Sequence, residues 1–169
     1  IILGMEAVFP SGRRREVAAL QLSGCVVLDA LVGNTDRHHE NWGILLHLLE
    51  PNKARAEIAP SFDHASSLGR ELLDAERARR LKENRVAHYI ENGRGGIFRS
   101  SADKHGLSPI ATARRLAENY PAFFAPWRDR LAKVDAAQFS TIVNRVPDAW
   151  MSPEARRFAE EMLRISHRM

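Results

Sequence analysis

Apolar residues recur at the spacing of a helix face from about Arg15 to Val32. The stripe they form consists of Val17, Leu20, Val27, Leu28 and Leu31. Gly24 falls on the same stripe, and a residue without a side chain there lets another segment approach the helix closely. Gly33 is suited to the left-handed backbone that follows a helix end, so the pattern predicts a helix that stops at this glycine.

The pattern then changes to that of two loops on either side of a β-hairpin. The expected ranges are a loop at 34–41, a strand at 42–49, a second strand at 54–59 and a second loop at 61–69. The first strand, WGILLHLL, is a continuous apolar run, which is typical of a strand that is buried. Pro51 lies in the short turn that joins the two strands, and Pro60 ends their pairing.

The rest of the chain has the pattern of five helices. Their expected starts are Asp74, Ser108-Pro109, Pro121, Asp135 and Ser152-Pro153. The first should continue to about Glu91, and each Ser-Pro pair combines an N-cap with a proline in the first helical turn. Asp135 with Gln138 fits a capping box. The predicted fold class is therefore mainly α with a β-hairpin, in a single domain over residues 1–169.

Composition narrows the class of protein further. The chain has 44% hydrophobic and 27% charged residues, which are values of a globular protein. No apolar run approaches the roughly 20 residues of a membrane span, so we expect no membrane partner. The single cysteine, Cys25, excludes a disulfide framework and favours a cytoplasmic location. The chain begins with Ile1 and Ile2 and shows no signal-peptide pattern, so we expect a fragment or a trimmed chain.

Charge gives a weaker indication of partners. The net charge is +4, and arginines occur in clusters such as Arg13-Arg14-Arg15. The guanidinium fork suits phosphate, so a polyanionic partner is permitted. The arginines are however spread over several expected helices among Glu and Asp, which is typical of ordinary solvated faces.

The densest cluster of chemically active side chains is the sequence GNTDRHHENWGIL at residues 33–45. Because a hairpin brings its two ends together, Asp36 and Asn41 before it should lie near Asp63 after it. Two carboxylates and one carboxamide form a set of hard oxygen ligands, which Mg²⁺ prefers together with water and phosphate. An acidic group that stays free of the metal could accept a proton from an attacking hydroxyl.

The spacing within this cluster is that of a phosphoryl-transfer loop. Asn41 follows Asp36 by five positions, as Asn follows the catalytic Asp in the kinase pattern H-R-D-x-x-x-x-N. In kinases a second Asp beyond the hairpin binds the metal, and Asp63 takes the corresponding place here. The D-x-x-x-x-N spacing alone is common, so the interpretation depends on its combination with the hairpin and Asp63.

Two segments, NTDRHHENWGIL and IAPSFDHASSLG, closely resemble the catalytic core of HipA-type bacterial kinases. These belong to the wider group that includes phosphatidylinositol 3- and 4-kinases. The family pattern D-R-H-x-x-N is matched at 36–41, and its pattern P-x-x-D is matched at 60–63. The resemblance covers about residues 15–70 and implies that the chain is the C-terminal lobe of a protein-kinase-like fold, the HipA-like C-terminal domain.

The resemblance also implies roles for individual residues. Asp36 would be the catalytic base, while Asn41 and Asp63 would hold Mg²⁺ that bridges the phosphates of ATP. His38 would support the loop, and Arg37 would either bind phosphate or brace the loop. The γ-phosphoryl group would pass to a protein serine or threonine hydroxyl, with lipid and small-molecule acceptors left open. The toxin–antitoxin physiology of the family implies a DNA-binding antitoxin as a further partner.

One part of a kinase is not matched in this chain. An N-lobe needs a phosphate-covering loop and a strand lysine, but none of the four lysines lies in such a strand context. The only glycine-rich stretch, NGRGG at 92–96, follows an expected helix and predicts a helix stop. We therefore expect the N-lobe to come from a longer chain or from a separate partner, and this chain alone to show weak or no catalysis.

Two other functions fit parts of the same pattern. The sequence DRHHEN before a hairpin has some likeness to His-Asn-His metal nucleases, whose sites usually need a further His on a following helix. The first helical candidate here is His88, beside Tyr89 and Ile90. Metal and nucleotide preference would separate the two, since a kinase needs Mg²⁺ with ATP. The third interpretation is a non-catalytic helical interaction domain that keeps a relic kinase site.

Overall fold

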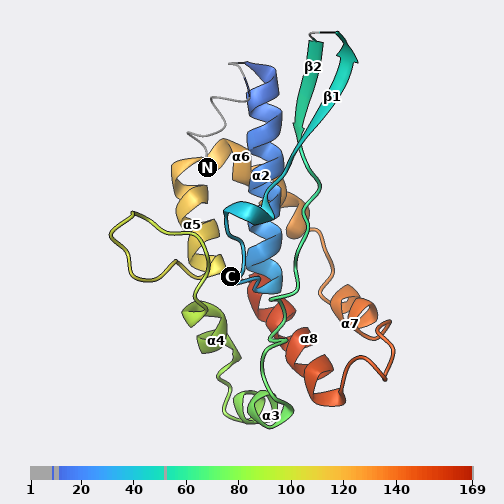
Figure 1. Cartoon of the computed structure of the whole chain (residues 1–169). Helices are drawn as coiled ribbons and strands as arrows, with labels where there is room; N and C mark the ends of the chain where they lie inside the picture. The colour runs from blue at the N-terminus through green and yellow to red at the C-terminus, as the bar shows by residue number, and fades with distance from the viewer. Residues whose placement is uncertain (1–8, 10–11, 52, 169) are drawn as a thin grey trace.

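The computed structural model describes residue 9 and residues 12–51 and 53–168 (Figure 1). The helices that it contains are α2 (Arg13–Val32), η1 (His39–Asn41, a 3₁₀ turn), α3 (Asp74–Lys82), α4 (Val86–Asn92), α5 (Pro109–Asn119), α6 (Pro121–Leu131), α7 (Ala137–Val143) and α8 (Pro153–Arg168). Its strands are β1 (Ile44–Glu50) and β2 (Lys53–Ile58), which pair antiparallel. The predicted class, mainly α with one hairpin, is confirmed.

Helix α2 is the central element, and α5, α6 and α8 all pack against it (Figure 1). Its predicted C-terminal boundary is confirmed, since Gly33 adopts the left-handed conformation at φ 67°. The predicted apolar stripe is wrong, because Val17 and Leu28 are exposed. The buried face is instead made of residues at i, i+4 spacing, namely Ala18, Leu22, Val26 and Ala30.

The close approach predicted at Gly24 is confirmed. A Cβ atom built on Gly24 would lie 2.6 Å from the indole of Trp127 in α6. The same indole donates a hydrogen bond of 2.6 Å from Nε1 to the carbonyl oxygen of Leu20. The missing side chain therefore creates the space in which α6 docks on α2.

The hairpin forms where it was predicted, but the prediction that its first strand is buried is wrong. Leu46 is 66% exposed and Leu48 84% exposed, and the hairpin extends away from the helices (Figure 1). The register runs from Ile44 opposite Ile58 to Glu50 opposite Lys53, with an irregularity after Leu48. An apolar run indicates that a strand needs a cover, and no segment among the described residues provides one for β1.

The helical remainder differs from the prediction at one point. The helix expected from Asp74 to Glu91 is two helices, α3 and α4, so six helices follow the hairpin in the described part of the chain. Asn84 has a left-handed φ of 54°, a conformation that Asn tolerates and that ends a helix. The N-cap predicted at Ser108 is confirmed, since its Oγ accepts a hydrogen bond from the backbone N–H of Ala111 in the first turn of α5.

The start of α7 also departs from the predicted capping box. Asp135 Oδ1 accepts a hydrogen bond of 2.9 Å from the backbone N–H of Ala137, the first residue of the helix. Gln138 donates its backbone N–H to the carbonyl of Asp135, and its side chain makes no hydrogen bond within the described chain. Asp135 therefore caps the helix without the reciprocal Gln138 contact.

Helix α8 completes the body of the molecule. Phe158 and Met162 are fully buried in a core that they share with Ala30 of α2 and Ile90 of α4. The ring of Phe158 also packs edge to face on Tyr89, with ring centroids 5.5 Å apart. This core fixes the C-terminal half of α2. It therefore also fixes the point from which the segment at 33–43 starts.

Replacing Gly24 by valine tests the docking of α6. The added side chain overlaps the Trp127 indole, so we expect the free energy of unfolding to fall by about 1–3 kcal/mol. Urea denaturation followed by circular dichroism measures this loss. The matched control is Gln21→Ala, an exposed position on the same helix that should change stability by about 0.5 kcal/mol or less. Equal effects of the two substitutions would contradict the packing described here.

Candidate functional site

The two loops on either side of the hairpin are joined by backbone hydrogen bonds. Ala59 donates its N–H to the carbonyl of Gly43 at 2.9 Å, which continues the pairing beyond the strands. Farther along, the N–H of Thr35 binds the carbonyl of Ser66, and that of Leu68 binds the carbonyl of Val32. The segment at 33–43 therefore lies beside the segment at 59–68, as hairpin geometry predicted.

Arg37 is the side chain that connects these loops. It is only 3% exposed, and its guanidinium donates to both segments. Its Nη1 binds the carbonyl oxygens of Asn41 at 2.7 Å and Phe62 at 3.2 Å. Its Nη2 binds Ser61 Oγ at 2.9 Å. Of the two roles that the resemblance left open for Arg37, this geometry fits the one that braces the loop.

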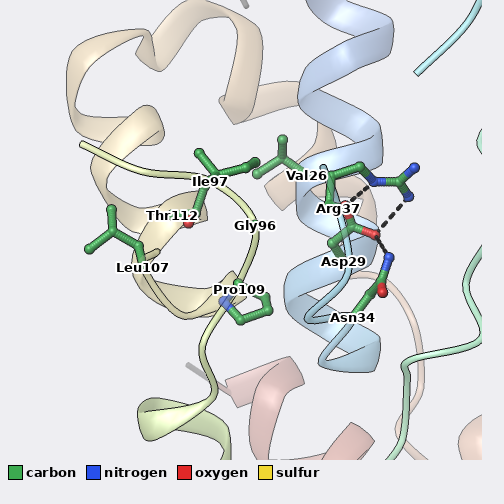
Figure 2. A pocket seen from close by; sticks show the side chains of 10 residues that line it. Val26, Asp29, Asn34, Arg37, Gly96, Ile97, Leu107, Pro109 and Thr112 are labelled. Carbon is green, nitrogen blue, oxygen red and sulfur yellow. Dashed lines mark hydrogen bonds and ion pairs between the residues drawn. The ribbon is translucent and has the colours of Figure 1, made fainter. Parts of the chain in front are cut away.

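The counterion of Arg37 is Asp29, near the end of α2 (Figure 2). Asp29 Oδ2 accepts from Nε at 2.7 Å, and Oδ1 accepts from Nη2 at 2.9 Å, so the pair is bidentate. Asn34 Nδ2 adds a third hydrogen bond to Oδ1 at 2.8 Å. Burial lowers the pKa of Arg37, but the hydrogen bond to Asp29 and the charge of Asp29 outweigh it, so the pKa lies above its usual value and Arg37 stays charged.

Asn41 is buried and is oriented by the same loop. Its Nδ2 donates to the carbonyl of Asp36 at 2.5 Å. No hydrogen bond among the described residues involves its Oδ1, so this oxygen remains free to bind a cation. The Asp36 side chain is 52% exposed, and its Oδ1 lies 3.9 Å from His38 Nε2.

Asp63 lies directly after Phe62, whose carbonyl shares the Arg37 Nη1 with the carbonyl of Asn41. Asn41 and the residue just before Asp63 therefore bind the same guanidinium nitrogen through their backbone carbonyls. Asp63 has a φ of 54°, in the left-handed region that non-glycine residues seldom adopt. Its carboxylate is exposed and makes no hydrogen bond or ion pair with the described residues. The charge of this carboxylate still acts on the Arg37 guanidinium.

The histidines of the cluster have structural contacts. His38 Nδ1 accepts a hydrogen bond from the backbone N–H of Glu40 at 3.2 Å, which shapes the 3₁₀ turn. His39 and Glu40 are exposed. His64 Nδ1 lies 3.4 Å from Arg37 Nη2 and 3.7 Å from Asp29 Oδ1, at the edge of the ion pair.

Three residues of the site were not predicted, namely Asp29, Asn34 and Gly96. Asp29 is the anion of the ion pair, and Asn34 donates a hydrogen bond to it. Gly96 contacts the loop directly, since a Cβ atom there would lie 2.9 Å from the carbonyl oxygen of Arg37. The NGRGG stretch is therefore more than the predicted helix stop. A polar residue inside an apolar helix face was the one sequence signal that could have indicated Asp29.

Two hollows border the loop. The one in Figure 2, lined by Asp29, Arg37 and Gly96 among others, has a volume of about 10 Å³ and room for about one water molecule. The second is a cleft of about 670 Å³ on the side of His38, between α2, α6 and the segment at 96–98. This second hollow has the size of a ligand site, as has a further hollow of about 650 Å³ that is lined by Pro60 and Ser61 among others.

Among the described residues no group of three or more His, Cys, Asp and Glu side chains converges as a metal cluster. A Mg²⁺ ion held by one carboxylate and one carboxamide does not need such a group, because phosphate and water complete its shell. A His-based nuclease centre does need one. In the same part of the chain no helix is both long and apolar enough to cross a membrane.

The helical body with its projecting hairpin and loop defines a kinase-like fold. The chain is similar to the crystal structure of the Helicobacter pylori proinflammatory kinase CtkA, with a TM-score of 0.65 and 24% sequence identity. The similarity covers 90% of this chain and 50% of that chain, so the chain spans half the length of that kinase. No protein-family model matches the sequence, and no curated protein matches it. The likeness therefore shows that this chain has a kinase-like fold.

Replacing Arg37 by methionine tests the ion pair. The change leaves Asp29 buried without its counterion, so we expect the free energy of unfolding to fall by about 3–5 kcal/mol. Chemical denaturation measures it, with Arg55→Met as the matched control. Arg55 pairs with Glu57 at the surface, where loss of the pair should cost about 1 kcal/mol or less. Similar losses in both variants would show that the buried pair does not organise the loops.

Cys25 offers a pH test of the same region. Burial raises the pKa of its thiol, although a hydrogen bond with Ser61 and the charge of Arg37 oppose the shift. Because only the thiolate reacts, we expect slower labelling by a disulfide reagent at pH 8 than for glutathione, with the rise in rate displaced to higher pH. In urea the difference should disappear. A rate profile that coincides with that of glutathione in the folded protein would contradict this environment.

Proposed function

We propose that this chain is the C-terminal catalytic lobe of a HipA-like kinase, which transfers the γ-phosphoryl group of ATP. The observation that carries the proposal is that one Arg37 nitrogen binds the backbone carbonyls of Asn41 and of Phe62, the residue before Asp63, while the Asn41 side chain binds the carbonyl of Asp36. The kinase-like fold supports it, because the fold is shared with a protein that is named a kinase. The acceptor in this proposal is a protein serine or threonine hydroxyl.

In this proposal each group has one task. The Oδ1 of Asn41 and the exposed carboxylate of Asp63 would hold Mg²⁺, and the ion would supply positive charge to the phosphates of ATP. The exposed carboxylate of Asp36 accepts the proton of the attacking hydroxyl. Arg37 does not touch the phosphates, because its donors are used by Asp29 and by the two loops.

The exposed hairpin supports the further proposal that a second lobe completes the enzyme. Ile44, Leu45 and Leu46 follow directly after the candidate metal-binding loop and are 43%, 42% and 66% exposed. A strand that is apolar on both faces is stable only when both are covered. A nucleotide-covering lobe, on a longer chain or a partner, would bury this strand and close the site above Asn41.

The alternatives have less support. A metal nuclease would need converging histidines, and the described residues contain no such cluster. His88, the first helical candidate, lies on α4 and is exposed. A non-catalytic interaction domain would not need a strained Asp63 with an unpartnered carboxylate. The cytoplasmic location stays a prediction from the single cysteine, and the antitoxin partner stays a prediction from the resemblance.

The proposal is tested by calorimetric titration of Mg²⁺·ATP into this chain and into a form that carries a second lobe. We expect Asp63→Ala to abolish Mg²⁺-dependent nucleotide binding, because it removes a metal ligand. Asp36→Asn should leave binding intact and reduce phosphoryl transfer by about 10²–10⁴-fold, since it removes only the base. The matched control is Asp129→Ala, an exposed carboxylate on α6. Normal binding and transfer in both site variants would reject the assignment.

A further inference from the structure

The large cleft beside the loop is an unassigned feature of this surface. It has a volume of about 670 Å³, enough for one or two large side chains but well short of a protein interface. Its walls are aromatic and aliphatic, with Leu22 and Val26 from α2, Phe123 from α6 and Phe98 from the segment after α4. Phe98 is 51% exposed at the mouth of the cleft.

The cleft reaches the catalytic loop. His38 and His39 form part of its wall, and His38 Nε2 is 3.9 Å from the carboxylate of Asp36. A hydroxyl that reaches Asp36 must come within about 2.6–3.2 Å of this carboxylate. Because an extended chain advances about 3.3–3.6 Å per residue, a side chain in the cleft would lie within about three residues of that hydroxyl.

Trp42, in the same wall of the cleft, has a buried hydrogen-bond donor without a partner among the described residues. Its ring lies under the guanidinium of Arg37, 5.1 Å from Cζ to the ring centroid. Its Nε1 is buried and has no hydrogen-bond partner among the described residues. A buried donor without a partner is unfavourable, and a peptide carbonyl that enters beside the ring would satisfy it after a small movement of the indole.

Basic residues occur in the segment that forms one wall of the cleft. The segment 93–107, whose residues 96–98 line the cleft, also carries Arg94, Lys104 and His105. Arg94 Nη1 lies 3.4 Å from His105 Nδ1, and neither Arg94 nor Lys104 has an ion-pair partner within the described part of the chain. Charges left unpaired beside an apolar cleft favour an acidic partner.

We propose that this cleft binds the phosphoryl acceptor, a serine- or threonine-containing peptide segment with a bulky apolar residue within about three positions of the hydroxyl and acidic residues beyond it. This inference rests on the proposed function and names its substrate class. A peptide is favoured over a lipid because the unsatisfied Trp42 donor suits a backbone carbonyl.

The test uses fluorescein-labelled, serine-centred peptides and anisotropy with this chain. One series places Leu or Phe at each position within three residues of the serine, and a second varies the flanks between acidic, neutral and basic. We expect the acidic, apolar-anchored peptides to bind, and Phe98→Ala to weaken them about tenfold. Arg94→Ala combined with Lys104→Ala should remove the preference for acidic flanks.

The matched control is Trp150→Ala, which deletes an 83% exposed aromatic side chain outside the cleft and should leave peptide binding unchanged. Phe98 is itself exposed, so its truncation should not unfold the chain, which a thermal melt verifies. Absence of peptide binding, equal binding without the apolar anchor, or unchanged binding by Phe98→Ala would overturn the proposal. Capture of the chain by vesicles that contain a phosphoinositide, lost in Phe98→Ala, would overturn it in favour of a lipid acceptor.

The same variants separate this inference from the proposed function. Phe98→Ala should bind Mg²⁺·ATP as the unmodified chain does, and Asp63→Ala should bind the peptides as the unmodified chain does. Peptide binding that depends on Phe98, together with nucleotide binding that ignores Asp63, would reject the kinase site and retain the cleft. The opposite pattern would reject the cleft and retain the kinase site.

Discussion

The buried ion pair between Arg37 and Asp29 is the interaction on which the two loops depend. Asp29 belongs to the central helix α2, whose position is fixed by the cores that it shares with α5, α6 and α8. Arg37, held by Asp29, binds the carbonyls of Asn41 and Phe62 and so fixes both loops relative to α2. These two residues lie more than twenty positions apart in the chain. The location of Asn41 and Asp63 thus follows from one guanidinium anchored to one helix. Its energetic weight comes mainly from the cost of leaving either charge buried alone.

A second constraint is the exposed apolar surface of β1, the strand that follows the loop. The hairpin that holds the loop ends together exposes aliphatic residues along nearly the whole of β1. In water such a surface favours association, because burial of apolar area is the main favourable contribution to folding and assembly. The anchored loop and the uncovered strand are adjacent, so a lobe that buried the strand would also close the candidate site.

The sequence predicted those features that depend on local chemistry. Gly33, Ser108 and the hairpin turn were correctly placed because caps and turns are determined by a few neighbouring residues. The break at Asn84 was missed although the polar residues at 82–85 interrupt the apolar spacing between Leu81 and Val86. The burial of β1 was predicted wrongly because an apolar run indicates that a cover is needed, without indicating where the cover comes from.

In the candidate site too, the features set by local geometry were predicted, and those set by tertiary packing were not. Hairpin geometry placed the loop at 36–41 beside the segment that contains Asp63, as the structure has it. The partners of Arg37 could not be predicted, because Asp29 is a single polar residue in a helix and its role depends on tertiary packing. Gly96 was missed for a similar reason, since a glycine that stops a helix and one that touches a distant loop have the same local sequence.

The central claim is that a metal–nucleotide complex binds between Asn41 and Asp63. Paramagnetic broadening by Mn²⁺·ATP in the ¹⁵N spectrum of this chain measures this directly, and it detects weak binding to an incomplete site. The account predicts that the amide signals of Asn41, Phe62 and Asp63 broaden first and that Asp63→Ala removes the effect. Broadening centred elsewhere, or unchanged broadening in Asp63→Ala, would contradict it.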